Sequence, residues 1–226
     1  QVAKLDDLWL DIGAQDRNEA ASVVKIGDPV TLKLDFQVLR NNLATSPGMD
    51  NRTGLWVIVE GLRRIKKEKL KVGVFAVSTV AEEIGLRGAR TSAFGVDPQI
   101  GIAVDVTHAT DCPTIDKRQQ GTIKLGKGPV IFVGPNMSPV VSRRLQSAAE
   151  ERQIPYQPAA VGRATSNDAN NLQISRAGVA TGLVSIPNRY MHSAVETVSL
   201  DDLDHAANLL AAFIENLTPE DDLRPW

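Results

Sequence analysis

The chain has 226 residues, of which 42% are hydrophobic and 23% are charged, and its formal net charge is −2. This is the composition of an ordinary globular protein, long enough for one large domain or for a medium and a small one. A charge this close to zero gives no reason to expect nucleic acid or a membrane as a partner.

Nothing in the sequence predicts export or membrane insertion. No apolar run approaches the ~20 residues that span a bilayer, and the opening QVAKLDDLWLD lacks the apolar core of a secretory signal. Cys112 is the only cysteine, so the chain has no internal disulfide. A reducing compartment fits this cysteine usage, and we expect a cytoplasmic protein.

The first forty residues predict a small β-rich part. Residues 8–12 and 29–38 alternate apolar and polar side chains, which is typical of strands, and residues 18–24 read as a short helix. The turn-rich stretch RNNLATSPG follows. We therefore expect a boundary after residue 42, with the main domain at residues 43–226.

The rest of the chain alternates predicted helices and strands. Helical spacing of apolar residues predicts helices at residues 53–69, 84–94, 139–153, 166–177 and 200–216. Short apolar runs predict strands at residues 71–78, 100–106, 129–133 and 180–186. Strands that are apolar on both faces and alternate with helices predict an α/β sandwich with both faces of its sheet covered.

Two acidic positions precede predicted helices. Asp50, in SPGMDNRTG, is either a helix N-cap or a metal ligand. Glu82 and Glu83 follow a predicted buried strand. One glutamate suits the positive end of a helix dipole, but two at the mouth of a buried strand are harder to explain in that way.

Two further positions lie at ends of predicted strands, where chemistry gathers in open α/β sheets. Asp105 interrupts an apolar run; it either caps the next loop or is paired with a cation, because burying a lone carboxylate is costly. His108 is a ligand or a solvent-facing loop residue. His192 follows the last strand, and Glu196, four residues on, is a candidate partner for its imidazole.

Taken singly, each position has a structural explanation, but together they form a chemical set. Carboxylates with an imidazole are the ligands of a catalytic zinc or cobalt site. Two-metal hydrolases share one carboxylate between two ions and need a free base to activate water. In the pair Glu82–Glu83, one residue could bind metal while its neighbour acts as the base.

Several blocks of the sequence, taken in order, resemble one family. They are LWLDIGA, IGDPVTL, GMDNRTG, STVAEEIGLRGA, GIAVDVTHA, LGKGPVI, SRAGVAT and IPNRYMHSAVE. They run over essentially the whole chain and resemble the tetrahedral-assembly (TET) metallo-aminopeptidases, which include glutamyl aminopeptidases and proteins once labelled endoglucanases. The resemblance implies a mixed-sheet α/β sandwich of the dinuclear-zinc exopeptidase type. Residues 1–42 would be the remainder of a small inserted β domain used for dimerisation.

The resemblance also implies a role for each candidate residue. Asp50 would bridge two divalent ions, zinc or cobalt, and Glu83 and His192 would bind one of them. Asp105 would bind the other ion. Glu82 would be the general base that activates the attacking water. The implied activity is removal of N-terminal amino acids from peptides by homo-oligomers, in which dimers assemble into a hollow dodecamer.

Three details of the resemblance concern particular positions. A cis peptide bond is implied between Asp50 and Asn51. The family has a further histidine ligand in an upstream motif like HMDEIG, whereas all three histidines here follow Asp50. We therefore expect the chain to lack the N-terminal part of the family, and one metal site to lack that ligand. The family's Thr-Asp-Ala is replaced by Asn167-Asp168-Ala169, which leaves the role of this segment open.

Two rival functions remain. A glycoside hydrolase also needs two carboxylates, about 5 or 6.5–9.5 Å apart, but a ligand set that includes His192 argues against it. The absence of the upstream histidine also fits a catalytically inactive structural paralogue. Retention of the remaining candidate ligands and of Glu82 argues against that reading.

Overall fold

The computed structural model describes residues 4–113, 115–221 and 223, and it divides into two compact units, Gln1–Lys33 and Leu34–Trp226. The first unit holds a 3-10 turn, η1 (Leu5–Asp7), and one helix, α1 (Arg17–Val23). The side chain of Asp16 caps this helix by accepting two backbone N–H groups of its first turn. The short helix expected at residues 18–24 is thus confirmed.

The strand predictions for the opening residues are wrong. In the described part of the chain before residue 37 no strand is assigned, and only Gln37–Val38 of the predicted 29–38 strand forms one, β1. Alternating side chains make a strand only where a neighbour completes the ladder of backbone hydrogen bonds. The assignment of residues 1–42 to an inserted β domain stays a prediction.

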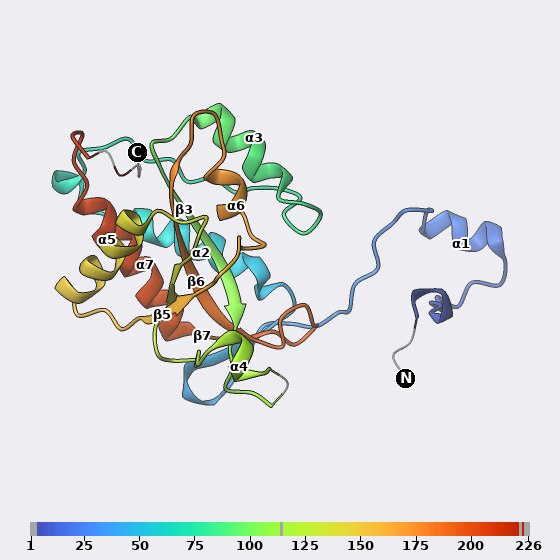
Figure 1. The fold of residues 1–226 in the computed structure, drawn as a ribbon. Coiled ribbons are helices and arrows are strands. Elements are labelled where there is room, and N and C mark those ends of the chain that lie inside the picture. The colour runs from blue at the N-terminus through green and yellow to red at the C-terminus, as the bar shows by residue number, and fades with distance from the viewer. Residues whose placement is uncertain (1–3, 114, 222, 224–226) are drawn as a thin grey trace. The chain divides into compact units, whose positions relative to one another are not determined.

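The second unit is built on a seven-stranded mixed sheet (Figure 1). Its strands are β1, β2 (Leu43–Thr45), β3 (Ile100–His108), β4 (Val130–Val133), β5 (Gln157–Ala160), β6 (Ala180–Arg189) and β7 (Thr197–Ser199). They lie in the order β1-β2-β7-β6-β4-β5, and β3 pairs with the other edge of β6. The mixed α/β sandwich expected from the sequence is confirmed.

Strand β6 organises this sheet. It pairs in parallel with β3 along its length, from Ile100 opposite Ala180 to His108 opposite Asn188. On its other edge it pairs antiparallel with β4 and, at its C-terminal end, with β7. Because β3 and β6 are parallel, their C-terminal ends reach the same edge of the sheet, and the loops that follow them start there.

The described residues form seven helices and three short 3-10 turns. Besides α1 they are α2 (Met49–Arg64), α3 (Arg87–Val96), α4 (Lys117–Gln120), α5 (Pro139–Glu151), α6 (Ala169–Leu172) and α7 (Leu200–Glu215), with turns η2 (Arg40–Asn42) and η3 (Lys67–Lys69). The predicted helices at 139–153 and 200–216 are confirmed, whereas the one at 166–177 is a single turn. None of the described helices is long and apolar enough to cross a membrane.

Both faces of the sheet are covered because neighbouring residues of its central strands point to opposite sides. One core joins the sheet to α2, α5 and α7; its members include Val104, Ile131, Val184, Val57, Leu145 and Leu209. The other lies on the opposite face; its members include Ala103, Val130, Leu183, Met137 and Ala169. This division explains the near-continuous apolar runs in the strand sequences.

The predicted buried strand at residues 71–78 is a second error. No strand is assigned there, and Phe75 is 71% exposed. Its apolar pattern matches that of β3 and β6, but in the described residues it has no assigned pairing with a strand. The segment instead forms one wall of a cavity that leads to the candidate site.

Candidate metal centre

Asp50 lies in the first turn of α2, at the sheet edge reached by β3 and β6. The residue at the N-cap position is Gly48, whose left-handed φ of 68° turns the chain into the helix. Asp50 itself has non-helical dihedral angles, and the peptide bond between Asp50 and Asn51 is cis, as the resemblance implied. The N-cap explanation of Asp50 is therefore wrong, and its side chain is free to face the site.

Asn51 ties this turn to the central sheet. Its Nδ2 donates to the carbonyl oxygen of Val104, at 2.8 Å, and its Oδ1 accepts the N–H of Gly54, at 2.9 Å. Any Cβ at Gly54 would lie 2.2 Å from that Oδ1. Glycine at position 54 thus leaves room for Asn51 to hold the start of α2 beside Asp105.

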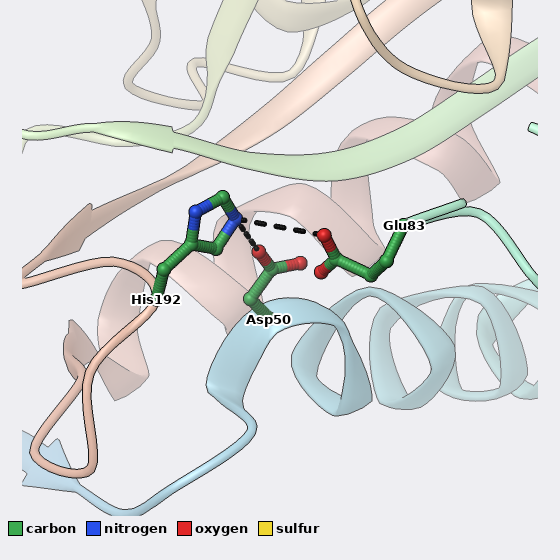
Figure 2. Close-up of side chains that lie close together, drawn as sticks. All are labelled: Asp50, Glu83 and His192. Carbon is green, nitrogen blue, oxygen red and sulfur yellow. Dashed lines mark ion pairs between the residues drawn. The ribbon is translucent and has the colours of Figure 1, made fainter. Parts of the chain in front are cut away.

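His192 comes from the loop between β6 and β7 and meets Asp50. Its Nε2 lies 3.1 Å from Oδ2 of Asp50 and 3.8 Å from Oε2 of Glu83 (Figure 2). Asp50, Glu83 and His192 each offer a ligand atom, and these atoms lie within 4.8 Å of one another. Three segments that are distant in the sequence therefore bring together ligand atoms spaced closely enough to bind one cation.

Glu82 and Glu83 lie in a tight turn that leads into α3. The carbonyl oxygen of Glu82 accepts the N–H groups of Gly85 and Leu86, and Gly88 donates its N–H to Val80. Within this turn Glu82 is half-buried, whereas Glu83 has a 63% exposed side chain. The two neighbours therefore differ in environment, as a ligand and a base would.

The carboxyl groups of the site raise one another's pKa. Burial raises the pKa of Glu82 to about 7, and the charges of Glu83, Asp168 and Asp50 add to the effect. Burial also raises the pKa of Asp105 to about 8, helped by the charge of Asp50, although a hydrogen bond from the Val106 N–H opposes the shift. A cation bound beside these carboxyl groups would stabilise their ionised forms.

Asp105 and His108 do not join the group of three. Asp105 lies near enough for its pKa to respond to Asp50 and Glu82, but its Oδ1 accepts the backbone N–H of Val106 at 2.8 Å. His108 is half-buried, and burial followed by the charge of His192 lowers its pKa. Neither of these two residues belongs to the set whose ligand atoms converge.

A cavity of about 860 Å³ opens beside the centre, between α2, β3 and residues 71–79. Its walls carry Asp50, Glu82, Glu83, Asp105 and Asp168 together with many apolar side chains. Thr79 donates a 2.6 Å hydrogen bond to Oδ2 of Asp168, whereas Oδ1 of Asp168 is buried and has no hydrogen-bond partner among the described residues. The cavity thus has an acidic end and an apolar remainder.

These residues fit the divalent metal ions that the resemblance implies. The converging donors are two carboxylates and one imidazole, which suit zinc or cobalt. Burial raises the pKa of Glu82, Asp50 and Asp105, and neighbouring carboxylates raise it further, whereas bound cations would favour the ionised forms. The donor chemistry and the local charge therefore agree.

Two features were missed or misjudged in the sequence. Glu196 does not meet the imidazole of His192 as expected; its two oxygens accept the backbone N–H groups of His192 and Asp50. The bridge that Asn51 makes to β3 was not predicted at all. Both features depend on backbone partners, which leave no trace in the residue types.

A mixed sheet covered on both faces, with carboxylates and a histidine meeting beyond its strand ends, defines an α/β protein whose converging side chains could hold a metal ion. The chain belongs to the family described as M42 glutamyl aminopeptidase, whose sequence profile matches residues 1–209. The resemblance to TET aminopeptidases is thereby confirmed.

Individual relatives agree with this placement. Lysyl aminopeptidase of Pyrococcus furiosus is 39% identical over 219 residues, which cover 96% of this chain and 61% of that protein. Aminopeptidase APDkam598 of Desulfurococcus kamchatkensis is 39% identical with a TM-score of 0.86, covering 97% of this chain and 62% of that one.

A third relative is described by its assembly. TET1 peptidase of Pyrococcus horikoshii, described as able to assemble into a tetrahedron or a large octahedral shell, is 32% identical with a TM-score of 0.76, covering 92% of this chain and 60% of that one. The chain thus spans about three fifths of the length of these relatives.

Proposed function

We propose that this chain carries the metal centre and general base of a metal-dependent aminopeptidase, which removes N-terminal amino acids from peptides. The proposal rests on one observation: ligand atoms of Asp50, Glu83 and His192 meet within 4.8 Å beside an acidic cavity, in a member of an aminopeptidase family.

The proposed ligands divide between two divalent ions. Asp50 would be shared by both ions, Glu83 and His192 would hold one of them, and Asp105 would hold the other. When bound, zinc or cobalt would polarise the scissile carbonyl and lower the pKa of the attacking water. Either metal accepts these nitrogen and oxygen ligands, so the donor set alone does not select between them.

Glu82 is the proposed general base. It takes a proton from the attacking water and delivers it to the leaving amine. Its half-buried place among other carboxylates raises its pKa to about 7 before any cation is bound. Cations bound beside it would lower that value, which leaves Glu82 ionised and able to accept a proton near neutral pH.

A further acidic group would favour free N-termini. Asp168, which is not among the proposed metal ligands, lines the same cavity as Asp50 and Asp105, and its charge would attract the α-ammonium group of a peptide. A peptide with a blocked amine loses this attraction. The cavity therefore favours an exopeptidase over an endopeptidase.

We also propose that the protein is a homo-oligomer based on dimers, up to a dodecamer. The assembly described for the TET1 relative supports this. Exposed apolar side chains in the first unit, such as Trp9 at 85% exposed, would be covered by a second copy. Light scattering of the purified protein tests the proposal, and a cytoplasmic location stays a prediction from the single cysteine.

The activity is tested with amino-acid p-nitroanilides. The peptidase proposal predicts hydrolysis that a chelator abolishes and that added zinc or cobalt restores, with acetylated anilides left intact. Hydrolysis of β-glucan that a chelator does not affect would support the glycosidase instead. Tight metal binding without any hydrolysis would support an inactive structural paralogue.

A further inference from the structure

The side chain of Glu196 connects the two loops that carry Asp50 and His192. Its Oε2 accepts the backbone N–H of Asp50 at 3.0 Å, and its Oε1 accepts the backbone N–H of His192 at 2.8 Å. Glu196 is 2% exposed, just ahead of β7. One buried carboxylate therefore accepts hydrogen bonds from the backbones of Asp50 and His192. The side chains of these two residues lie 3.1 Å apart, measured from His192 Nε2 to Asp50 Oδ2.

Both donors need such an acceptor. Asp50 lies in the first turn of α2, where backbone N–H groups have no partner within the helix. His192 has a left-handed φ of 62° in a loop and no ladder of its own. A carboxylate has an oxygen for each N–H, whereas water has no access to a side chain this deeply buried.

The backbone of Glu196 adds a third connection. Its carbonyl oxygen accepts the N–H of Ser46 at 3.1 Å, just before α2 begins. The start of α2 is thus fixed to the segment that follows His192 at two points, Ser46 and Asp50. In the described residues the backbone N–H of His192 has Glu196 as its acceptor, and this bond helps to hold the exposed imidazole of His192 over Asp50.

We propose that Glu196 is a positioning residue for the metal centre: it sets the separation of the Asp50 and His192 backbones so that their side chains bind the same ion. The inference rests on the proposed function, because it requires that Asp50 and His192 are ligands. Glu196 itself has no contact with the ion in this role.

Two substitutions distinguish the hydrogen bonds of Glu196 from its negative charge. Glu196→Gln has one acceptor oxygen, and its amide group would face an N–H donor, so one of the two loops is released. Glu196→Asp keeps both acceptor oxygens on a side chain that is shorter by one methylene, so both bonds lengthen. Metal affinity should fall in the order wild type, Glu196→Asp, Glu196→Gln.

Asp202 provides a matched control. It is fully buried, and its two oxygens accept the N–H groups of Gly126 and Gly128, at 2.8 and 2.7 Å. The charged groups that shift its pKa are His205 and Asp201, and none of the proposed metal ligands is among them. Asp202→Asn therefore removes the same kind of double acceptor at a site away from the metal centre.

The test measures zinc affinity by competition with a chromophoric chelator, starting from metal-free protein, together with the visible spectrum of the cobalt-loaded forms. Glu196→Gln should bind zinc at least ~10-fold more weakly than wild type and alter the cobalt spectrum. Asp202→Asn should retain wild-type values for both, although it too lowers the melting temperature of the metal-free protein.

The outcomes are distinct. Unchanged affinity and spectrum in Glu196→Gln would overturn the positioning role while leaving the proposed function in place. Equal losses in Glu196→Gln and Asp202→Asn would overturn it too, because the effect would then be general destabilisation. If Glu196→Gln does not fold, the comparison of Glu196→Asp with Asp202→Asn decides. Failure of the wild type to bind zinc would overturn the proposed function itself.

Discussion

His192 Nε2 lies 3.1 Å from Oδ2 of Asp50, and this contact joins the loop after β6 to the first turn of α2. Glu83 approaches the same point from the turn before α3. Each of the three side chains extends from its own element, so the centre depends on how the sheet edge positions three separate loops.

Replacing His192 by alanine removes one proposed ligand. We expect zinc affinity to fall at least ~10-fold, since even residues behind the ligands have effects of that size. The metal-free protein should keep its melting temperature, because the side chain is 64% exposed and surface substitutions cost little. His108→Ala is the control: it lies outside the converging group and should keep wild-type zinc affinity.

Glu82→Gln tests the general base. It should lower kcat by about 10²–10⁴-fold, the usual contribution of general acid–base catalysis, while two metal ions remain bound. In the wild type, activity should rise with pH as Glu82 loses its proton, with a midpoint below the metal-free value of about 7. A variant that keeps wild-type kcat would show that another group accepts the proton.

The titration of Asp105 should lower the stability of the metal-free protein as the pH rises from about 4 to about 8. The pKa of Asp105 is about 8 in the folded chain against an ordinary value of 3.8. Between these values the folded chain holds a proton that the unfolded chain has lost, so raising the pH favours unfolding. The pKa of Glu82 is about 7 in the folded chain against an ordinary value of 4.5, so its titration also lowers stability as the pH rises.

Asp105→Asn isolates this effect. The variant should melt above the wild type at pH 8 when both are metal-free, and the two should converge near pH 4. Thermal melts across the pH range measure the difference in melting temperature. The contributions of the other titrating groups cancel in this difference because both proteins contain them. A gap that does not change with pH would contradict the prediction.

Gly54→Ala should weaken metal binding although Gly54 is not a proposed ligand. A Cβ at this position would lie 2.2 Å from Oδ1 of Asn51, so the Asn51 side chain must leave the carbonyl of Val104. We expect a lower melting temperature and weaker zinc binding, because the start of α2 loses its bond to β3. Gly95→Ala, in α3 with no atom near the added Cβ, should lose neither.

The long elements of the fold could be predicted because their patterns are strong. The helix at 139–153 and the strand at 180–186 carry clear periodicity and lie close to α5 and β6. Residues 8–12 and 71–78 have equally strand-like patterns but no described ladder partner, which a local pattern cannot reveal. Strands of three or four residues, such as β2 and β7, are too short for a pattern to show.

The side chains of the centre were named from the sequence, but the framework around them was not. Asp50, Glu83 and His192 are residue types that bind metals, and their blocks resemble a known family. The bonds from Asn51 to Val104 and from Glu196 to two backbone N–H groups join residues that are far apart in the chain. Backbone donors and acceptors are the same at every residue, so only the fold can identify them.

The most direct test of the account is a metal titration of activity. Metal-free protein is mixed with increasing zinc or cobalt, and release of p-nitroaniline from an amino-acid anilide is followed at each step. The account predicts no hydrolysis without metal and a rate that reaches its maximum at two ions per chain. Hydrolysis by the metal-free protein, or none by the fully loaded protein, would contradict it.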